Sequence, residues 1–286
     1  MGFLCWMAVL LALLLSAHDS LAVVDQNQLT TLIKQVLNRY KPGYKAKNQY
    51  NQHYMKTPMF SLVVSIPFNN KTKQYDISQL PDGTLVKKTI LDCNVYVGQR
   101  VVAATLLKWP DVLDQCPNGN VSWPDFQRRC PKGVRTWSDV SEQCNIPVNV
   151  TRADHAEYRT VQNISTLLRN HSQNDLLLFY VYASPCAQKC TNISNTANIL
   201  QKIQPVGHLK NFAFVFSKVF KPRGSESLPV EELRGALTDL GSTIGLQNIF
   251  RCDDSNGSMN CMNCSSHGEV AQECYVDQHS GQHSIG

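Results

Sequence analysis

Apolar residues in the first third of the chain predict one amphipathic helix followed by strands. The helix is predicted over residues 27–40, with an apolar face formed by Leu29, Leu32, Ile33, Val36, Leu37 and Tyr40. Residues 59–67 are β-branched and apolar, which is typical of a strand. A turn is expected at Pro81-Asp82-Gly83, and further strands are expected at 89–97 and 100–107.

From residue 154 onward, amphipathic segments alternate with continuously apolar ones. Residues 175–183 form an apolar run that is typical of a strand buried on both faces. Such alternation favours an α/β sandwich around a central sheet. Helices are predicted at 154–169, 186–203 and 230–240, and strands at 175–183, 212–220 and 244–250.

Residues 109–144 hold a short internal repeat. Its three units begin at Trp109, Trp123 and Trp137 and end at Cys116, Cys130 and Cys144. We interpret residues 108–148 as a small disulfide-stapled insertion in which each unit forms about one helical turn. The tryptophan rings either form the core of this insertion or present a recognition surface to an extracellular protein or glycan.

Residues 1–22 have the pattern of a secretory signal peptide. The apolar run from Val9 to Leu15 is too short to span a bilayer, and Ser20 and Ala22 place small residues at the expected cleavage site. The alternative is an N-terminal membrane anchor, and no later segment is predicted to span a membrane. If residues 1–22 are removed as a signal peptide, the mature protein is expected to be secreted and not bound to a membrane.

The composition supports a folded, extracellular chain. The 286 residues are 43% hydrophobic and 17% charged, which excludes wholesale disorder, and the net charge of +5 permits an anionic partner without requiring one. Glycosylation acceptor sites number about three by chance for this content of Asn, Ser and Thr. The chain has such sites at Asn70, Asn120, Asn149, Asn163, Asn170, Asn192, Asn256 and Asn263.

The ten cysteines that follow the predicted signal peptide fall into groups. Two sets of four are expected to form disulfides within each set, at positions 93, 116, 130 and 144 and at positions 252, 261, 264 and 274. The order of the cysteines does not select the pairing within a set. Cys186 and Cys190 stand apart from both sets.

These two cysteines combine with His155 into a candidate metal site. One imidazole and two thiolates are zinc ligands, and three protein ligands leave a fourth position for water. Glu157 is not needed as a ligand and can move protons. Asp154 is expected to cap a helix that holds His155 and Glu157 in its first turn, and Pro185 is expected to begin the helix that carries both cysteines.

Simpler interpretations of the same residues remain open at this point. Glu157 could form a capping pair with Asp154. Cys186 and Cys190 could form one more disulfide of a secreted protein. The Cys261-x-x-Cys264 pair is an alternative zinc motif, although disulfide bonding is the expected use of both residues.

The order His-x-Glu, then Pro-Cys and a second nearby Cys, resembles the zinc-dependent cytidine deaminase superfamily, and most closely its AID/APOBEC-like branch. The resemblance covers roughly residues 27–250, with the Trp/Cys repeat as an insertion. It implies a three-layer α/β/α sandwich around a mixed five-stranded sheet. The signal peptide and the disulfide cysteines are similar to the secreted AID/APOBEC-like (SNAD) group, which is linked to immunity. The expected organisation is a signal peptide (1–22), a deaminase-like domain (23–250) and a cysteine-containing tail (251–286).

The resemblance also implies residue roles. His155, Cys186 and Cys190 would bind Zn²⁺, and Glu157 would be the proton shuttle. The segment 217–220 is similar to a basic and aromatic stretch of the family. Candidate substrate contacts are therefore Ala156, Ser184, Lys218, Phe220, Lys221 and Arg223. The alternative is that Phe220 belongs to the core and that the basic residues form a solvated loop.

The sequence as a whole predicts a secreted, glycosylated zinc deaminase that converts cytosine to uracil in single-stranded DNA or RNA. The enzymatic alternative is a deaminase of free cytidine or deoxycytidine. A second class is a non-catalytic extracellular binding glycoprotein on a deaminase scaffold. A third is a disulfide-bonded glycoprotein without metal, in which Cys186 and Cys190 are oxidised.

Overall fold

The structure is a computed structural model that describes residues 24–48, 50–150, 152–222, 228–255 and 257–277. The predicted signal peptide (1–22) and Arg223 lie outside the described residues. Within the described ranges, the helices are too short or too polar to cross a bilayer.

The centre of the molecule is a mixed seven-stranded sheet in the order β13-β12-β11-β10-β3-β7-β6. The strands are β3 (Phe60–Ile66), β6 (Tyr96–Val97), β7 (Val101–Thr105), β10 (Leu176–Ala183), β11 (Phe212–Lys218), β12 (Ile249–Ser255) and β13 (Ser258–Asn263). β10, β11 and β12 are parallel, and all other neighbours in this sheet are antiparallel. The expected number of five strands was wrong, because short β6 extends one edge and β13, from the cysteine-containing tail, extends the other.

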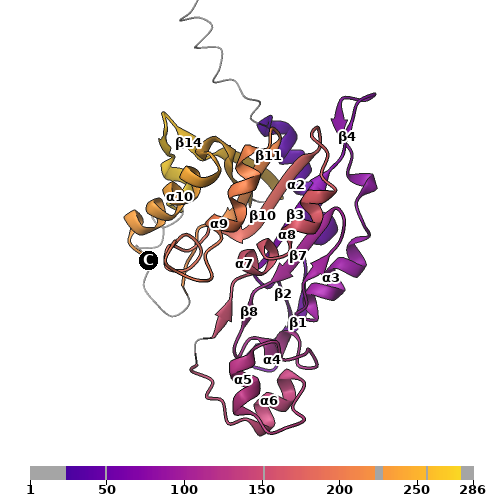
Figure 1. The fold of residues 1–286 in the computed structure, drawn as a ribbon, viewed down its shortest axis with the longest axis vertical. Coiled ribbons are helices and arrows are strands. Elements are labelled where there is room, and N and C mark those ends of the chain that lie inside the picture. Colours follow the sequence, from indigo (N-terminus) through magenta and orange to yellow (C-terminus); the bar gives the residue numbers. More distant parts are fainter. Residues whose placement is uncertain (1–23, 49, 151, 223–227, 256, 278–286) are drawn as a thin grey trace, which may run out of the picture.

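Helices cover both faces of this sheet (Figure 1). One face packs against α2 (Gln26–Tyr40) and α3 (Gly83–Leu91), and the other packs against α7 (Ala156–Val161), α8 (Ile164–Arg169), α9 (Leu200–Ile203) and α10 (Val230–Ile244). Alternate residues of β10 point to opposite layers, so that Phe179 lies in one core and Leu178 in the other. The predicted three-layer α/β/α sandwich is confirmed.

The helix expected over 186–203 was wrong. Only one turn forms at its start, where the Cys186 carbonyl accepts the N–H groups of Cys190 (3.0 Å) and Thr191 (3.2 Å), and regular helix returns only in α9. Between them, the Asn192 and Asn195 side chains accept backbone N–H bonds from residues two positions later, at 2.9 Å each. Such local asparagine bonds compete with the helical ladder, and the segment is therefore a loop.

The signal at Pro81-Asp82-Gly83 marks the beginning of a helix instead of a simple turn. The Asp82 carboxylate accepts the Thr84 N–H and caps α3, which runs to Leu91 and replaces the beginning of the strand expected over 89–97. Gly83 is required because a Cβ at this position would collide with the Arg39 carbonyl oxygen. The strand expected over 244–250 likewise begins only at Ile249, because α10 continues to Ile244.

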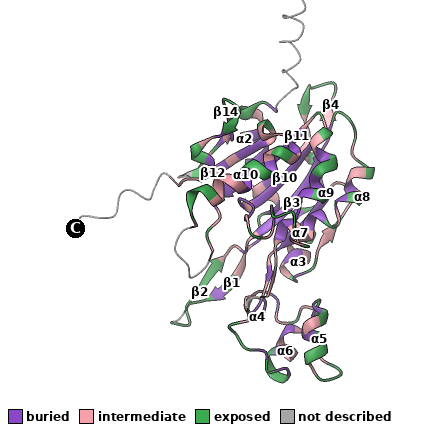
Figure 2. Cartoon of the chain, turned by 60° about the vertical axis from the view of Figure 1, so that its left-hand side comes forward, coloured by how far each residue is buried: buried purple, intermediate pink, exposed green. Residues whose placement is uncertain are grey.

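The Trp/Cys repeat forms a separate lobe below the sheet, which we call the Trp lobe (residues 108–148; Figures 1 and 2). It contains α4 (Val112–Gln115), α5 (Pro124–Arg129) and α6 (Trp137–Gln143), one per repeat unit, and strands β8 (Leu107–Lys108) and β9 (Ala153–Asp154) pair at its neck. Trp109, Trp123 and Trp137 are 2%, 1% and 0% exposed. Their interpretation as the core of the insertion is confirmed, and rings buried this deeply do not form an exposed recognition surface.

The eight cysteines of the two sets pair within their sets, as predicted. The bonds are Cys93–Cys116, Cys130–Cys144, Cys252–Cys261 and Cys264–Cys274. Bonding of Cys261 and Cys264 to different partners also confirms their use in disulfides. Cys186 and Cys190 are buried free thiols.

The remaining elements are short. Three two-stranded hairpins pair β1 (Tyr44–Lys47) with β2 (His53–Lys56), β4 (Phe68–Asn69) with β5 (Gln74–Tyr75), and β14 (Ser265–Ser266) with β15 (Glu269–Val270). The 3-10 helices are η2 (Ile77–Gln79), η3 (Gln204–His208), η4 (Leu246–Asn248) and η5 (Gln272–Cys274).

Candidate metal centre and active site

The predicted site residues gather at one end of the sheet strands. β3 begins at this end and β7 and β10 finish there, because Phe60 pairs with Thr105 and Ser61 pairs with Val181. We call this end of the strands the metal edge. β9 leads directly into α7, which brings His155 to this edge, and the loop after β10 brings Cys186 and Cys190.

The helix expected over 154–169 is divided into α7 and α8, and its N-cap lies one residue later than expected. His155 is the N-cap residue of α7, and its carbonyl accepts the Arg159 N–H at 3.0 Å. Asp154 was expected to be the cap, but it belongs to β9 and its carboxylate accepts the Trp123 Nε1–H at 2.8 Å. The backbone at His155 is extended, so that its imidazole leaves the end of the helix and can meet the cysteine loop.

His155, Cys186 and Cys190 converge into one cluster whose donor atoms all lie within 4.8 Å of one another. The His155 Nδ1 lies 3.2 Å from the Cys190 Sγ and 3.6 Å from the Cys186 Sγ, and the two sulfurs are 3.4 Å apart. Tetrahedral zinc with ordinary Zn–N and Zn–S bonds holds such donors about 3.5–3.8 Å apart. The three residues therefore fit a zinc ion with little rearrangement.

Glu157 lies against this cluster from the first turn of α7. Its Oε1 is 3.5 Å from the His155 Nδ1 and accepts the Cys190 thiol at 3.0 Å, and the residue is only 8% exposed. The contacts of the carboxylate are thus with the candidate ligands, whereas the capping pair with Asp154 is not formed because Asp154 bonds Trp123. A carboxylate beside a metal site that does not need it as a ligand is suited to move protons.

The cluster shifts the proton affinities of its own members. Burial disfavours the imidazolium, but hydrogen bonds to Cys186 and Glu157 outweigh it and raise the pKa of His155 to about 10. Burial also opposes the Glu157 carboxylate, but the hydrogen bond and charge of His155 lower the pKa of Glu157 overall.

The two thiols differ in proton affinity. The contact of its sulfur with the Cys190 sulfur lowers the pKa of Cys186 to about 4, with burial opposing the shift and His155 adding to it. The same contact and burial raise the pKa of Cys190. Cys186 is therefore easily deprotonated, as a thiolate ligand of a metal must be.

The remaining predicted contacts separate into two groups. Ala156 is buried as the first residue of α7, and the Ser184 Oγ accepts the Phe220 N–H at 3.0 Å while the Phe220 ring lies 6.4 Å from the His155 ring. These three residues adjoin the metal cluster. Lys218 and Lys221, in contrast, form ion pairs of 2.7 Å with Asp253 and Asp277 of the tail.

A basic surface that the motifs did not indicate lies at the metal edge. Residues 26–75 contain eight Lys and Arg residues and no Asp or Glu, a charge block that was visible in the sequence. The β1–β2 hairpin lies within this block and directly precedes β3, so it emerges at the metal edge. The outer face of this hairpin carries Lys45, Lys47, His53 and Met55, all exposed.

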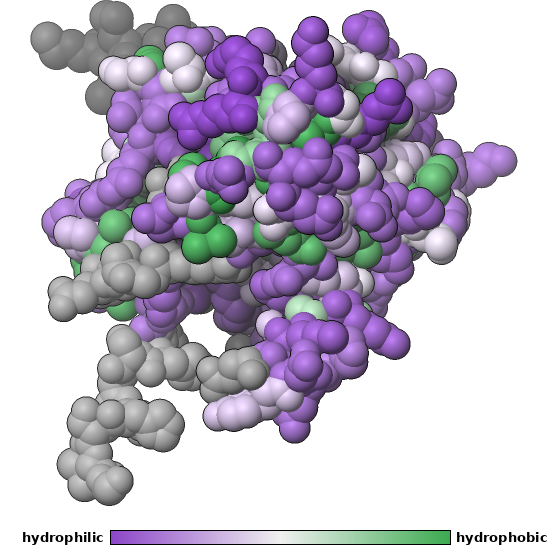
Figure 3. Space-filling view, turned by 90° about the horizontal axis from the view of Figure 1, so that it is seen from below, coloured by the Kyte–Doolittle hydropathy of each residue, from purple (hydrophilic) through white to green (hydrophobic). Residues whose placement is uncertain are grey.

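A groove lies beside this hairpin, away from the metal cluster. It measures about 780 Å³ and runs between α2, β2 and α3, with Lys41, Lys87 and Lys88 in its lining. Seen from below, the surface is mainly hydrophilic, with small hydrophobic areas between (Figure 3). This end of the molecule is therefore hydrophilic and carries several lysines.

Comparison with known proteins places the cluster in a family. The family model described as Secreted Novel AID/APOBEC-like Deaminase 1 matches residues 140–278, a range that includes His155, Glu157, Cys186 and Cys190. Neither a curated protein nor a solved structure matches the chain.

Proposed function

We propose that the chain, which matches the family model of a secreted AID/APOBEC-like deaminase over residues 140–278, is a zinc-dependent enzyme that converts cytosine to uracil. The observation that carries this proposal is the convergence of His155, Cys186 and Cys190 on one point with Glu157 beside it. Three soft donors with an adjoining carboxylate are the parts that hydrolytic base deamination needs.

Zinc bound to these donors would activate water for attack on C4 of the base. Glu157 would accept a proton of that water at Oε1 and pass it to the departing amino group, so that cytosine and water give uracil and ammonia. Burial of Glu157 keeps bulk water away from this proton path. The Ser184 hydroxyl holds the backbone of Phe220, and the ring of Phe220 beside His155 offers an apolar wall to a planar base.

We propose single-stranded nucleic acid as the substrate, in preference to a free nucleoside. The hairpin at the metal edge presents Lys45 and Lys47 without an acidic partner among the described residues, and Tyr50 and Tyr54 are 74% and 46% exposed. Basic side chains that follow a backbone and aromatic rings on which bases stack are the two parts of a single-strand binding surface. A nucleoside would use neither.

An extracellular location is part of this proposal. Four disulfides are typical of an oxidising compartment, and the family is described as secreted. The acceptor residues Asn70, Asn120, Asn149, Asn170 and Asn192 are exposed and accessible to glycosylation. Such a protein would meet foreign nucleic acid outside the cell, which is consistent with a role in immunity.

The decisive experiment measures metal and product on the purified, secreted chain. We expect about one zinc ion per chain, and uracil formation on single-stranded oligonucleotides that exceeds formation on duplexes and on free cytidine. A chain without metal, with Cys186 and Cys190 joined in a disulfide, would overturn the enzyme assignment. Bound zinc without deamination of any cytosine substrate would instead support a binding glycoprotein on a deaminase scaffold.

A further inference from the structure

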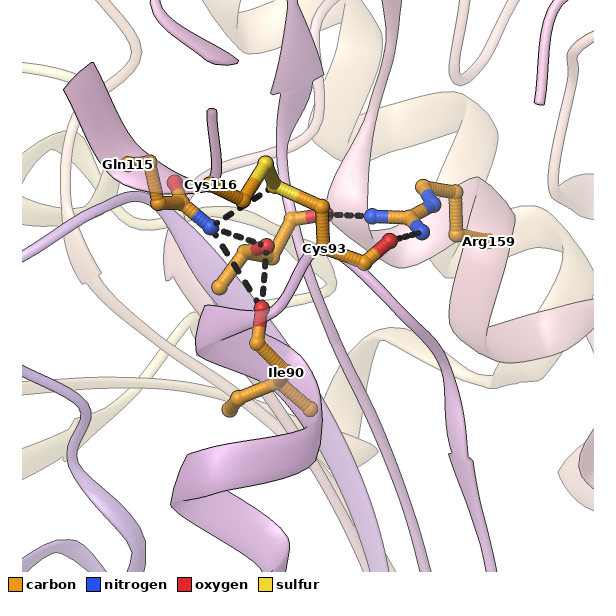
Figure 4. Close-up of a disulfide and its surroundings, with 6 residues drawn as sticks. Ile90, Cys93, Gln115, Cys116 and Arg159 are labelled. Carbon is orange, nitrogen blue, oxygen red and sulfur yellow. Dashed lines mark hydrogen bonds between the residues drawn. A yellow bond between two sulfur atoms is a disulfide. The ribbon is translucent and has the colours of Figure 1, made fainter. Parts of the chain in front are cut away.

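A half-buried cation lies on the same helix as the candidate catalytic residues. Arg159 is one turn after His155 in α7, and its guanidinium donates hydrogen bonds of 2.6 Å to the carbonyls of Thr105 and Cys93 (Figure 4). Among the described residues it forms no ion pair with a carboxylate. Burial lowers the pKa of Arg159 to about 10, although the charge of Asp154 opposes this shift.

This placement is energetically costly. A guanidinium loses hydration as it is withdrawn from water, and hydrogen bonds to neutral carbonyls offset less of this free-energy cost than an ion pair with a carboxylate would. A helix that only had to cover the sheet would be served by an apolar residue at this position. The two short bonds therefore point to a positional role for Arg159.

The acceptor at Cys93 is itself held in an unusual conformation. Cys93 has a φ of +61°, a region that residues other than glycine enter only when their surroundings force them to. The disulfide to Cys116 provides one constraint. Gln115 provides another, because its Nε2 contacts the Cys93 Sγ at 3.4 Å and the Thr105 Oγ1 at 2.9 Å (Figure 4). The Cys93 carbonyl is thereby kept aimed at Arg159.

These contacts hold α7 on both sides of the metal ligand. Before His155, the Asp154 carboxylate is bonded to Trp123 of the Trp lobe. After His155, Arg159 is bonded to Cys93, which the disulfide joins to Cys116 of the same lobe. His155 and Glu157 lie between the two attachments.

We propose that Arg159 is a positioning residue for the metal centre, and that it acts through the Cys93–Cys116 disulfide to fix the orientation of α7 relative to the cysteine loop. This inference rests on the proposed zinc site. The Arg159 guanidinium bonds the carbonyls of Thr105 and Cys93 and not the donor atoms of the metal cluster, so the effect is on the placement of His155 and Glu157. Loss of supporting contacts around metal ligands typically weakens metal affinity or activity about 10- to 100-fold.

The test compares Arg159→Met, Arg159→Lys and the double variant Cys93→Ala/Cys116→Ala with the wild type. The control is Cys130→Ala/Cys144→Ala, which removes the other disulfide of the same lobe. Each protein is loaded with Co²⁺ as a spectroscopic probe, its metal affinity is measured by chelator competition, and kcat and KM are determined with the zinc form. Circular dichroism and melting establish that each variant is folded.

We expect Arg159→Met and the Cys93/Cys116 variant to bind Co²⁺ about 10- to 100-fold more weakly, with an altered absorption spectrum. Their kcat should fall while KM stays within about twofold, because the substrate surface is untouched. Arg159→Lys should recover part of the loss, since it keeps a charged donor. The Cys130/Cys144 variant should match the wild type in both readouts.

Wild-type affinity and spectrum in a folded Arg159→Met protein would overturn the inference, and so would equal losses in the two disulfide variants. If Arg159→Met does not fold, the inference is tested by the two disulfide variants alone: a loss of metal affinity only in the Cys93/Cys116 variant supports it, and equal losses overturn it. Failure of the wild type to bind Co²⁺ would contradict the proposed zinc site itself, which is a distinguishable result.

Discussion

At the scale of single residues, Glu157 shows how contacts select between two chemical roles. A glutamate in the first turn of a helix can cap that helix or act on a neighbouring site. Its carboxylate contacts His155 and Cys190, whereas Asp154, the other half of the expected capping pair, is bonded to Trp123. Glu157 is thus available to the chemistry of the site.

We predict that Glu157→Gln retains zinc and the fold but loses deamination. The amide is nearly isosteric and leaves the three metal ligands intact, yet it cannot accept and return a proton. The rate should fall about 10²- to 10⁴-fold, measured as uracil formed on a single-stranded oligonucleotide. Glu231→Gln in the first turn of α10, where the side chain is 82% exposed, is the matched control and should keep full activity. Equal rates for Glu157→Gln and the wild type would remove Glu157 from the mechanism.

At the scale of elements, the Trp lobe is a small core with its own hydrogen bonds. Trp123 and Trp137 stack edge to face with ring centroids 4.9 Å apart, and they are 1% and 0% exposed. Their indole N–H groups differ in hydrogen bonding. The Trp123 Nε1–H donates to the Asp154 carboxylate, whereas the Trp137 Nε1 is buried without a partner among the described residues.

We predict that Trp123→Phe destabilises the protein more than Trp137→Phe. Both substitutions remove a similar volume from the same core, but only Trp123→Phe breaks a hydrogen bond to a charged group, worth about 1.5–3 kcal/mol. Weaker contact of the ring with Arg152 adds to this loss, whereas Trp137→Phe removes a buried N–H that has no partner among the described residues. Urea unfolding followed by circular dichroism measures the two changes in the free energy of unfolding. Equal losses would show that the bond to Asp154 contributes nothing to stability.

At the scale of the whole molecule, the candidate metal site lies at one end of the sheet strands only. β3 connects two basic hairpins: β1–β2 emerges at the metal edge, and β4–β5 follows Ile66 at the opposite end. Each carries a pair of exposed lysines, Lys45 and Lys47 on the first and Lys71 and Lys73 on the second. Only the first pair lies at the metal edge, where our proposal requires the substrate strand to enter.

We predict that Lys45→Glu/Lys47→Glu raises KM for single-stranded oligonucleotides and leaves kcat/KM for free cytidine unchanged. For each phosphate that a lysine no longer neutralises, the slope of log KM against log salt should fall by about 0.7. Lys71→Glu/Lys73→Glu makes the same change in net charge at the other end of the sheet and serves as the control. If both double variants raise KM equally, overall charge and not the hairpin guides the substrate.

Much of this architecture follows from the sequence alone. Unbroken apolar runs determined the central strands, because a strand covered on both faces has no polar side. The spacing of His155, Glu157, Cys186 and Cys190 predicted a common site, and the structure brings the three candidate ligands into one cluster with Glu157 beside it. Closeness along the chain also determined that the eight disulfide cysteines pair within two sets.

Only the tertiary structure decided which partners these residues meet. The tail returns to pair Lys218 with Asp253 and Lys221 with Asp277, and the Trp lobe withdraws Asp154 from its expected capping role. The contact of Arg159 with the Cys93 carbonyl joins residues 66 positions apart. The periodicity of apolar residues predicts which side chains a segment buries. These long-range contacts depend instead on which distant segments the sheet brings together, and local periodicity does not encode them.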